Sequence, residues 1–344
     1  MSGAEPAGAA ARTSGETRRP ASAGPADGRV RVTSGARLHF GLLGAPASRG
    51  NRIGSLGLTV EHPRVVLEAE RAGALEVEGP QAERVRHLAA AFLDRVGISA
   101  GARLRVVEAI PEHVGLGSGT QTALAVAAAL SRLHGLAGDV PAWCAALGRA
   151  RRSGIGAHAF RLGGFLLDAG RADGGQAPPP LVFRQPFPEE WGLLAVVPAA
   201  GRGVSGSEEE RVFEELPRPP EALLDRLCGL ILMRLVPALL ERDLRAFGTA
   251  LESVQEGVGR CFENVQGGLY HPQAVPIVRW LRGAGGVGVG QSSWGPAVYA
   301  LAPTEAAARA LAGGLRERGP FVPGTGLFLM RPRNRGAEVS VAAA

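Results

Sequence analysis

The chain has 344 residues, 45% of them apolar, and a formal net charge of +6, a composition that predicts a globular protein of about two domains. All 38 basic side chains are arginine and none is lysine, which excludes chemistry that needs a lysine Schiff base, including pyridoxal phosphate as a cofactor. The arginines are scattered along the chain and are not interleaved with aromatic residues, so we expect small anionic ligands and no nucleic-acid partner.

Residues 1–28 contain almost nothing to bury and predict a disordered tail. They also lack the apolar core of a secretory signal, and no apolar run in the chain is long enough to span a membrane. The three cysteines are far apart and show no metal-binding or redox spacing. We therefore expect a cytoplasmic protein with reduced thiols and no membrane partner.

Ordered structure is expected from Val30, where alternating residues predict a strand that contains the segment RLHFGL. Arg37 and His39 lie on the same face of such a strand, because side chains two residues apart point the same way. This geometry suits an anion, but the spacing fits two exposed polar residues on an edge strand equally well. Gly54–Gly57 predict a turn before further antiparallel strands, and the apolar spacing over residues 81–96 predicts a helix.

The first glycine-rich turn, PEHVGLGSGTQ at residues 111–121, passes directly into a helix predicted over Gln121–Leu133. Its glycines allow backbone N–H groups to turn inward, and the helix dipole adds partial positive charge. The turn therefore predicts an anion cradle. A helix N-terminus capped by Ser118 or Thr120 is the alternative that the pattern leaves open.

A helix predicted over Pro141–Arg152 runs into the second glycine-rich turn, RRSGIGAHAFR at residues 151–161. This turn has three arginines, a serine and a histidine but no acidic residue, which favours an anionic ligand. The pair Gly163-Gly164 and an apolar segment follow, ending at Asp168.

The strand WGLLAVVP begins at Trp191, so we place a domain boundary near residue 190, between domains at 29–190 and 191–344. Amphipathic helices are predicted over residues 221–262 with a break at Pro237, and their apolar stripe makes a homodimer the expected assembly.

The third glycine-rich turn, GGVGVGQSSWGP at residues 285–296, leads into the strand AVYAL. Backbone this permissive beside two hydroxyls and an indole is typical of a segment that approaches a ligand closely. A helix over 304–317 and a strand over 327–331 complete an α+β domain.

Three such turns in this order, after RLHFGL, resemble the GHMP kinase superfamily over nearly all of residues 30–335. PEHVGLGSGTQ is similar to the superfamily's PxxxGLGSS phosphate loop, and GVGQSSWGP to its C-terminal glycine-rich motif. The resemblance implies an α+β fold of two domains: an N-terminal domain with a βαβ phosphate cradle and a ferredoxin-like C-terminal domain. The site would lie in the cleft between them.

The chain departs from the kinases at one position. Their catalytic aspartate stands in a segment SG-x-D before a glycine pair, and here that position is Gly156. Without this carboxylate the usual base for phosphoryl transfer is missing. The set RLHFGL, GLGSGTQ, RSGIG and GQSSWGP is instead similar to the β-ribofuranosylaminobenzene 5′-phosphate synthase branch.

That branch implies a glycosyl transfer that joins 4-aminobenzoate to phosphoribosyl pyrophosphate, releases CO2 and pyrophosphate, and uses no ATP. The reaction belongs to the biosynthesis of a methanopterin-type one-carbon carrier. Two alternatives remain: a small-molecule kinase whose missing acid comes from Asp168 or Glu112, and a non-catalytic homologue that binds phosphoribosyl pyrophosphate.

The resemblance also implies roles for individual residues. The residues expected to bind pyrophosphate are Gly115, Gly117, Ser118, Gly119, Thr120 and Gln121. The expected catalytic residues, which hold the 5′-phosphate and the carboxylate without a division between them, are Arg37, His39, Arg152 and His158. Further substrate contacts are expected from Ser153, Gly154, Arg161, Gln291, Ser292, Ser293 and Trp294. Mg2+ or Mn2+ would be placed by Ser118. Asp168 would bind the metal or ribose hydroxyls, or would simply cap a strand end, and Trp294 fits a core position as well.

Overall fold

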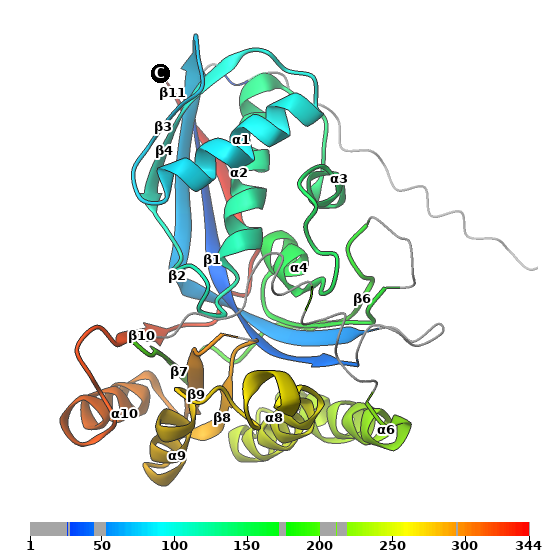
Figure 1. Ribbon diagram of the computed structural model, residues 1–344, viewed down its shortest axis with the longest axis vertical. Helices are drawn as coiled ribbons and strands as arrows, with labels where there is room; N and C mark the ends of the chain where they lie inside the picture. Colours follow the sequence, from blue (N-terminus) through cyan, green and yellow to red (C-terminus); the bar gives the residue numbers. More distant parts are fainter. Residues whose placement is uncertain are drawn as a thin grey trace, which may run out of the picture.

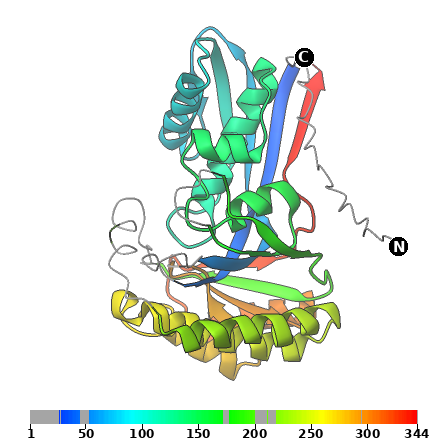
Figure 2. The ribbon, with the colours of Figure 1, turned by 90° about the vertical axis from the view of Figure 1, so that its right-hand side faces the viewer.

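The computed structural model describes residues 26, 28–44, 53–171, 177–199, 211, 219–293 and 295–343. Most of the predicted tail and the whole of Trp294 lie outside these residues. The described chain forms two layered halves, one above the other in Figures 1 and 2.

The first half is built on a seven-stranded sheet with the order β11-β1-β2-β4-β3, in which β5 also pairs with β2 and β6. Its strands are β1 Gly28–Leu43, β2 Gly54–Ala72, β3 Glu76–Glu78, β4 Gly101–Glu108, β5 Phe165–Asp168, β6 Leu181–Gln185 and β11 Glu338–Ala343. The long strands β1 and β2 run from the top of this half down to the second half (Figure 1). Gly54–Gly57, predicted as a turn, are the start of β2.

Strand β1 lies inside the sheet, between β11 and β2, with register shifts between Gly35 and Arg37 and between His39 and Gly41. Pairing with β11 ends at Thr33, but beyond it His39 pairs with Gly57 of β2 and its backbone bonds to Ser292 and Ser293, and it is only 3% exposed. The edge-strand alternative for Arg37 and His39 is therefore wrong.

Helices α1 Ala82–Arg95, α2 Ser118–His134, α3 Val140–Ala146 and α4 Ile155–Leu162 cover one face of this sheet (Figure 2). The predicted helix at 81–96 is confirmed, and the one after the first glycine-rich turn starts earlier, at Ser118. The helix expected over Pro141–Arg152 stops at Ala146, because Gly148 and Ala150 take positive φ. The prediction of a second glycine-rich turn over residues 151–161 is wrong beyond Gly154, because α4 begins at the next residue.

The second half holds a four-stranded sheet, β10-β7-β9-β8, with every pair antiparallel. Its strands are β7 Gly192–Val197, β8 Val287–Gln291, β9 Val298–Ala302 and β10 Gly326–Met330. Its helices are α6 Glu221–Leu230, the π-helix η1 Ile231–Leu235, α7 Val236–Leu240, α8 Leu244–Gln266, α9 Val275–Gly283 and α10 Glu305–Arg318. In chain order this is the βαββαβ pattern, which confirms the ferredoxin-like prediction and the α+β class.

Two local predictions in this half are wrong. Pro237 does not break a helix: α6, η1 and α7 follow one another without a gap, and Pro237 sits in the first turn of α7 after the π-helix, where its missing N–H costs little. Gly285–Gly290 do not form one turn, since β8 begins at Val287. Gly288, at φ +59°, supplies the register shift of β8 against β9.

The predicted boundary near residue 190 falls between β6 and β7, which belong to different sheets, but β11 returns to the first sheet and pairs with β1. Arg333, 1% exposed, precedes β11 and forms ion pairs with Glu61 (2.7 Å) and Glu338 (3.2 Å). One buried cluster includes Phe40 of β1 and Tyr299 of β9, whose ring centroids are 4.9 Å apart. The two halves therefore share a core. Among the described helices, none has both the length and the apolarity to cross a bilayer.

Candidate functional site

The β1 motif, the first glycine-rich turn and the third one meet where the two halves join. The Ser292 hydroxyl donates to the Gly115 carbonyl (2.8 Å) and accepts from the His39 backbone N–H (2.9 Å). The Ser293 N–H donates to the His39 carbonyl (3.0 Å). Arg37 also donates to the Gly115 carbonyl. Segments far apart in the sequence thus form one hydrogen-bonded unit.

Glycine is required where these segments approach one another. Gly115 and Gly117 have φ of +93° and +80°. A Cβ on Gly115 would lie 2.1 Å from the Ser292 carbonyl oxygen, and one on Gly117 would lie 2.8 Å from Cγ of Arg37. Gly117 is also the N-cap of α2, and no side chain caps this helix. The alternative of a Ser118 or Thr120 cap is therefore wrong, and the first N–H groups of α2 have no side-chain acceptor there.

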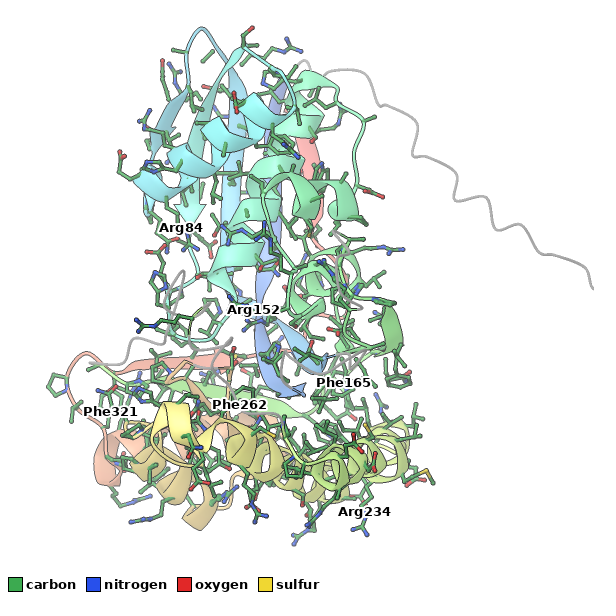
Figure 3. All side chains as sticks on the ribbon, turned by 45° about the vertical axis from the view of Figure 1, so that its right-hand side comes forward. Arg84, Arg152, Phe165, Arg234, Phe262 and Phe321 are labelled. Carbon is green, nitrogen blue, oxygen red and sulfur yellow. The ribbon has the colours of Figure 1, made fainter. Side chains whose placement is uncertain are left out.

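Two arginines that the sequence analysis did not single out converge on the first turn of α2. A Cβ on Gly119 would lie 3.1 Å from Nη2 of Arg84 and 3.6 Å from Nη1 of Arg149. Arg84, labelled in Figure 3, is paired with Glu112, but Nε of Arg149 is buried without a partner among the described residues. Burial, and to a lesser degree Arg84, lower the pKa of Arg149. Two guanidinium groups at the positive end of a helix repel one another, and an anion would relieve that repulsion.

No local pattern in the sequence could have identified this pair, because Arg84 lies on α1 and Arg149 follows α3. Only the packing of both helices beside α2 brings them together.

A chain of side-chain hydrogen bonds runs inward from His39. Nε2 of His39 lies 3.1 Å from the Ser153 hydroxyl, which lies 2.6 Å from the Ser55 hydroxyl. Ser55 donates to Asp168, which also accepts from the backbone N–H groups of Gly154 (2.9 Å) and Gly170 (2.8 Å). Asp168 is 1% exposed, and burial raises its pKa to about 6.

Other predicted site residues have their polar atoms engaged elsewhere. The Gln121 amide accepts from the Ser34 hydroxyl (2.6 Å) and donates to the Gly156 carbonyl (2.8 Å), so it joins β1, α2 and α4. Nε2 of His158 donates to the Pro179 carbonyl (2.7 Å), and burial lowers the pKa of this histidine. Arg161 is exposed in the last turn of α4. Gln121 and His158 therefore bond to other parts of the fold, and Arg161 lies at the surface.

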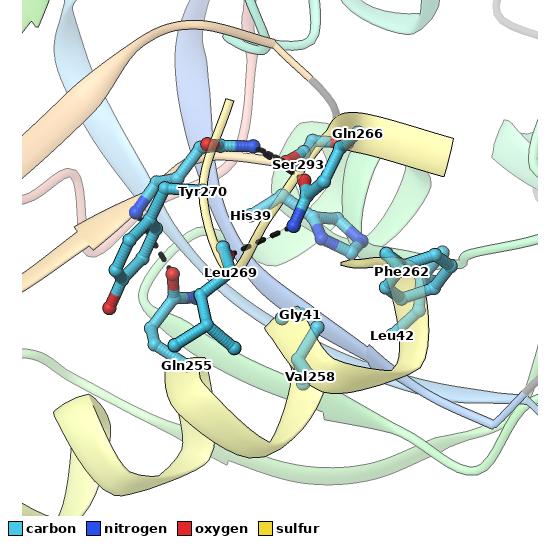
Figure 4. A pocket seen from close by; sticks show the side chains of 12 residues that line it. His39, Gly41, Leu42, Gln255, Val258, Phe262, Gln266, Leu269, Tyr270 and Ser293 are labelled. Atoms are coloured by element: carbon cyan, nitrogen blue, oxygen red, sulfur yellow. Dashed lines mark hydrogen bonds between the residues drawn. The ribbon is translucent and has the colours of Figure 1, made fainter. Parts of the chain in front are cut away.

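A small pocket opens beside His39, between β1 and α8 (Figure 4). Its volume is about 30 Å3, and it has an apolar side formed by Leu42, Val258, Phe262 and Leu269. Its polar side includes Gln255, Gln266 and Gln291, which bond to one another: the Gln291 backbone N–H donates to Gln255 (2.9 Å) and the Gln291 side chain to Gln266 (3.2 Å). Gln291 therefore lines the pocket, while the predicted Trp294 lies outside the described residues. In Figure 3, Arg152 and Phe262 lie toward the middle of the molecule, where the halves face each other.

Known proteins share this architecture and much of this sequence. The chain matches the models of the GHMP kinase N-terminal domain over residues 83–164 and of the GHMP kinase C-terminal domain over residues 235–320. The beta-ribofuranosylphenol 5′-phosphate synthase of Methanothermobacter thermautotrophicus is 34% identical over 328 residues, 89% of this chain and 97% of that protein. The chain belongs to this synthase family. The protein of the same name from Archaeoglobus fulgidus is 31% identical, and the match covers 91% of this chain and 100% of that protein.

Membership in the synthase family confirms the resemblance to a non-kinase branch of the GHMP superfamily, and it makes the chain an enzyme of the synthase class. The fold itself is shared with kinases. L. major mevalonate kinase, solved in complex with R-mevalonate, superposes with a TM-score of 0.64 at 16% identity, over 88% of this chain and 96% of the kinase.

The surroundings of Gly156, where the resemblance places the kinase acid, leave little room for a side chain. Gly156 is buried in the first turn of α4, and a Cβ there would lie 2.9 Å from Cγ2 of Thr120 and 3.0 Å from its Cβ. The kinase acid position is thus closed by Thr120. Any carboxylate at this position requires Thr120 to move.

The two residues predicted to bind a divalent cation differ in their surroundings. Asp168 does not fit as a ligand, because three protein donors occupy its oxygens in a buried position. The described residues contain no group of three His, Cys, Asp or Glu side chains arranged for a metal. Ser118 is the first residue of α2, and its hydroxyl is chemically compatible with Mg2+, which commonly takes few protein ligands.

Proposed function

We propose that this enzyme transfers the phosphoribosyl group of phosphoribosyl pyrophosphate to an aromatic acid, with loss of pyrophosphate and CO2. The observation that carries the proposal is the convergence of Arg84 and Arg149 on the uncapped first turn of α2. It supplies a strong diphosphate site in a chain whose kinase acid position is closed. Family membership supports the same reaction class.

The chemistry follows from where the positive charge lies. Cleavage of the bond between the ribose C1 and its oxygen leaves the electron pair on pyrophosphate, and the α2 N–H groups with Arg84 and Arg149 stabilise that charge as it develops. The ring carbon that bears the carboxylate then bonds to C1. The carbon–carboxylate bond breaks next, CO2 leaves, and its electron pair restores the aromatic ring.

A divalent cation belongs to this proposal as a companion of the diphosphate. Mg2+ or Mn2+ would be held by diphosphate oxygens and the Ser118 hydroxyl, and it would supply further charge neutralisation. Asp168 is left out of the proposed cation site.

The acceptor is proposed from two sources. The relatives are named for a ribofuranosylphenol, in which a phenol is joined to the ribose. The resemblance found in the sequence implies 4-aminobenzoate. Both 4-hydroxybenzoate and 4-aminobenzoate carry a para group that donates electrons toward the attacking carbon, so both are acceptors to test.

The deciding experiment measures release of 14CO2 from each acid labelled in its carboxyl group, with phosphoribosyl pyrophosphate and Mg2+. We expect equimolar CO2 and pyrophosphate. A parallel reaction contains ATP and the alcohol substrates of GHMP kinases in place of phosphoribosyl pyrophosphate. ATP turnover without CO2 release would reject the proposal in favour of a kinase, and binding of phosphoribosyl pyrophosphate without turnover would indicate a non-catalytic homologue.

The diphosphate site has its own test in Arg149→Gln. Loss of a hydrogen bond to a charged group costs about 1.5–3 kcal/mol, so the Kd for phosphoribosyl pyrophosphate should rise about 10- to 100-fold in calorimetric titrations. Arg95→Gln, an exposed arginine in the last turn of α1, is the matched control and should leave the Kd unchanged. Equal affinities in the two variants would remove Arg149 from the site.

A further inference from the structure

His39 lies between the pocket and the chain of hydrogen bonds that leads through Ser153 and Ser55 to Asp168. Its imidazole is 3% exposed, and Nδ1 is buried without a partner among the described residues. A buried polar atom without a partner costs free energy, so its persistence calls for a ligand. Figure 4 shows the ring among the residues that line the pocket, above Gly41 and Leu42.

The hydrogen-bond chain decides which ring nitrogen carries the proton. An ionised Asp168 only accepts, so the Ser55 hydroxyl must donate to it. Ser55 then accepts from Ser153, and Ser153 accepts from Nε2–H of His39. Every donor in the chain points toward Asp168. Nδ1 is left with a free electron pair.

The electrostatic surroundings keep this imidazole neutral. Burial, and to a lesser degree the charge of Arg37, hold the pKa of His39 well below its usual value. A neutral ring is a weak ligand for the 5′-phosphate or the carboxylate, the roles that the sequence had suggested. It is a good acceptor for a neutral O–H or N–H donor.

We propose that Nδ1 of His39 accepts the proton of the para hydroxyl or amino group of the aromatic acceptor, whose ring lies against Leu42 and Phe262, and that Ser153, Ser55 and Asp168 position it for this role. This inference rests on the proposed function and names the acceptor subsite within it. The enclosed volume of about 30 Å3 holds roughly one water molecule, so the side chains around the pocket must separate when the ring enters.

Nδ1 of His39 accepts the proton of the para group and later returns it. As the para O–H or N–H bond breaks, its electron pair moves through the ring to the carbon that attacks the ribose, and Nδ1 takes the proton. Loss of CO2 sends an electron pair back to the para oxygen or nitrogen, which recovers the proton from the imidazolium. The ionised Asp168, reached through two hydroxyls, stabilises the imidazolium in between.

The first test reads the tautomer directly by long-range 1H–15N NMR on protein labelled with 15N-histidine. We expect His39 to be the Nε2–H tautomer. Ser55→Ala should abolish this preference, because it removes the hydroxyl that links Ser153 to Asp168. Ser131→Ala, which removes a buried hydroxyl outside the chain, should leave the spectrum of His39 unchanged. A wild-type Nδ1–H tautomer would overturn the proposal.

The second test separates binding from chemistry. General bases contribute about 10²- to 10⁴-fold, so His39→Ala should lower kcat by at least about 100-fold with the Kd for phosphoribosyl pyrophosphate within about twofold of wild type. Ser55→Ala should lower kcat about tenfold, a smaller effect because it acts through His39. Synthase activity that survives His39→Ala would refute this inference and leave the proposed function intact. Absence of CO2 release from the wild-type enzyme would refute the proposed function first.

Discussion

The close approach of Thr120 to Gly156 predicts that a side chain at position 156 destabilises the protein. Gly156→Ala places a methyl group 2.9 Å from Cγ2 of Thr120, closer than carbon atoms tolerate. Overpacking of this kind costs about 1–3 kcal/mol. Alanine in place of glycine returns up to about 1 kcal/mol through helix propensity. The net expectation is a loss of about 1 kcal/mol in the free energy of unfolding.

A double-mutant cycle isolates the contact. Thr120→Ser removes Cγ2 but keeps the hydroxyl and Cβ, which would lie 3.0 Å from the new methyl group, so Gly156→Ala should cost less in that background. The coupling energy between the two positions should be about 0.5–1 kcal/mol, measured by denaturant titration of the four proteins. Equal losses in both backgrounds would show that Thr120 does not close the position, and the argument against a carboxylate there would fail with it.

Gly156→Asp extends the same reasoning to activity. Because Thr120 occupies the space beside this position, the variant should gain no ATP-dependent phosphoryl transfer, as followed by ADP production. Gly156→Asp combined with Thr120→Ser tests whether space at this position alone separates phosphoryl transfer from phosphoribosyl transfer.

Three further predictions concern stability and assembly. Burial raises the pKa of Asp168 from an ordinary 3.8 to about 6, so the folded protein binds this proton more tightly than the unfolded chain does. The free energy of unfolding of the wild type should therefore fall by about 3 kcal/mol, relative to that of Asp168→Asn, as the pH rises from about 4 to about 6. Urea titrations of both proteins measure this difference. A flat difference would contradict the raised pKa. Arg333→Met should cost about 3 kcal/mol because it removes a buried guanidinium that bonds to Glu61, Glu338 and the Gly336 carbonyl. Arg335→Met, at an exposed arginine that also pairs with Glu61, should cost less than about 1 kcal/mol, and equal costs would show that burial of the pair is unimportant. The predicted homodimer should have twice the mass of one chain in light scattering, and Met233→Glu, at a 71% exposed apolar residue of η1, should yield monomers if this face forms the contact.

Two of the glycine-rich segments predicted from the sequence do meet in the structure, because glycine positions report close approach of backbone. Gly115 and Gly117 approach Ser292 and Arg37. The α+β class follows from the order of strands and helices, and the sheet order confirms the ferredoxin-like second half that the resemblance implied. The same reasoning misplaced elements where glycine lies inside a strand or helix, as at Gly54 and Gly156. A glycine marks a steric need, but not which element meets it.

What the sequence by itself determined was local: the glycine-rich loop at the start of α2, the absence of an acid at Gly156, and the lack of any lysine. Tertiary structure alone decided which side chains share the site. It brought Arg149 to Gly119, joined His39 to Asp168 through two serines, and turned His158 toward Pro179. The physical reason is that hydrogen bonds and charge pairs depend on distances of a few ångströms between segments that are far apart along the chain, and periodicity and spacing do not encode those distances.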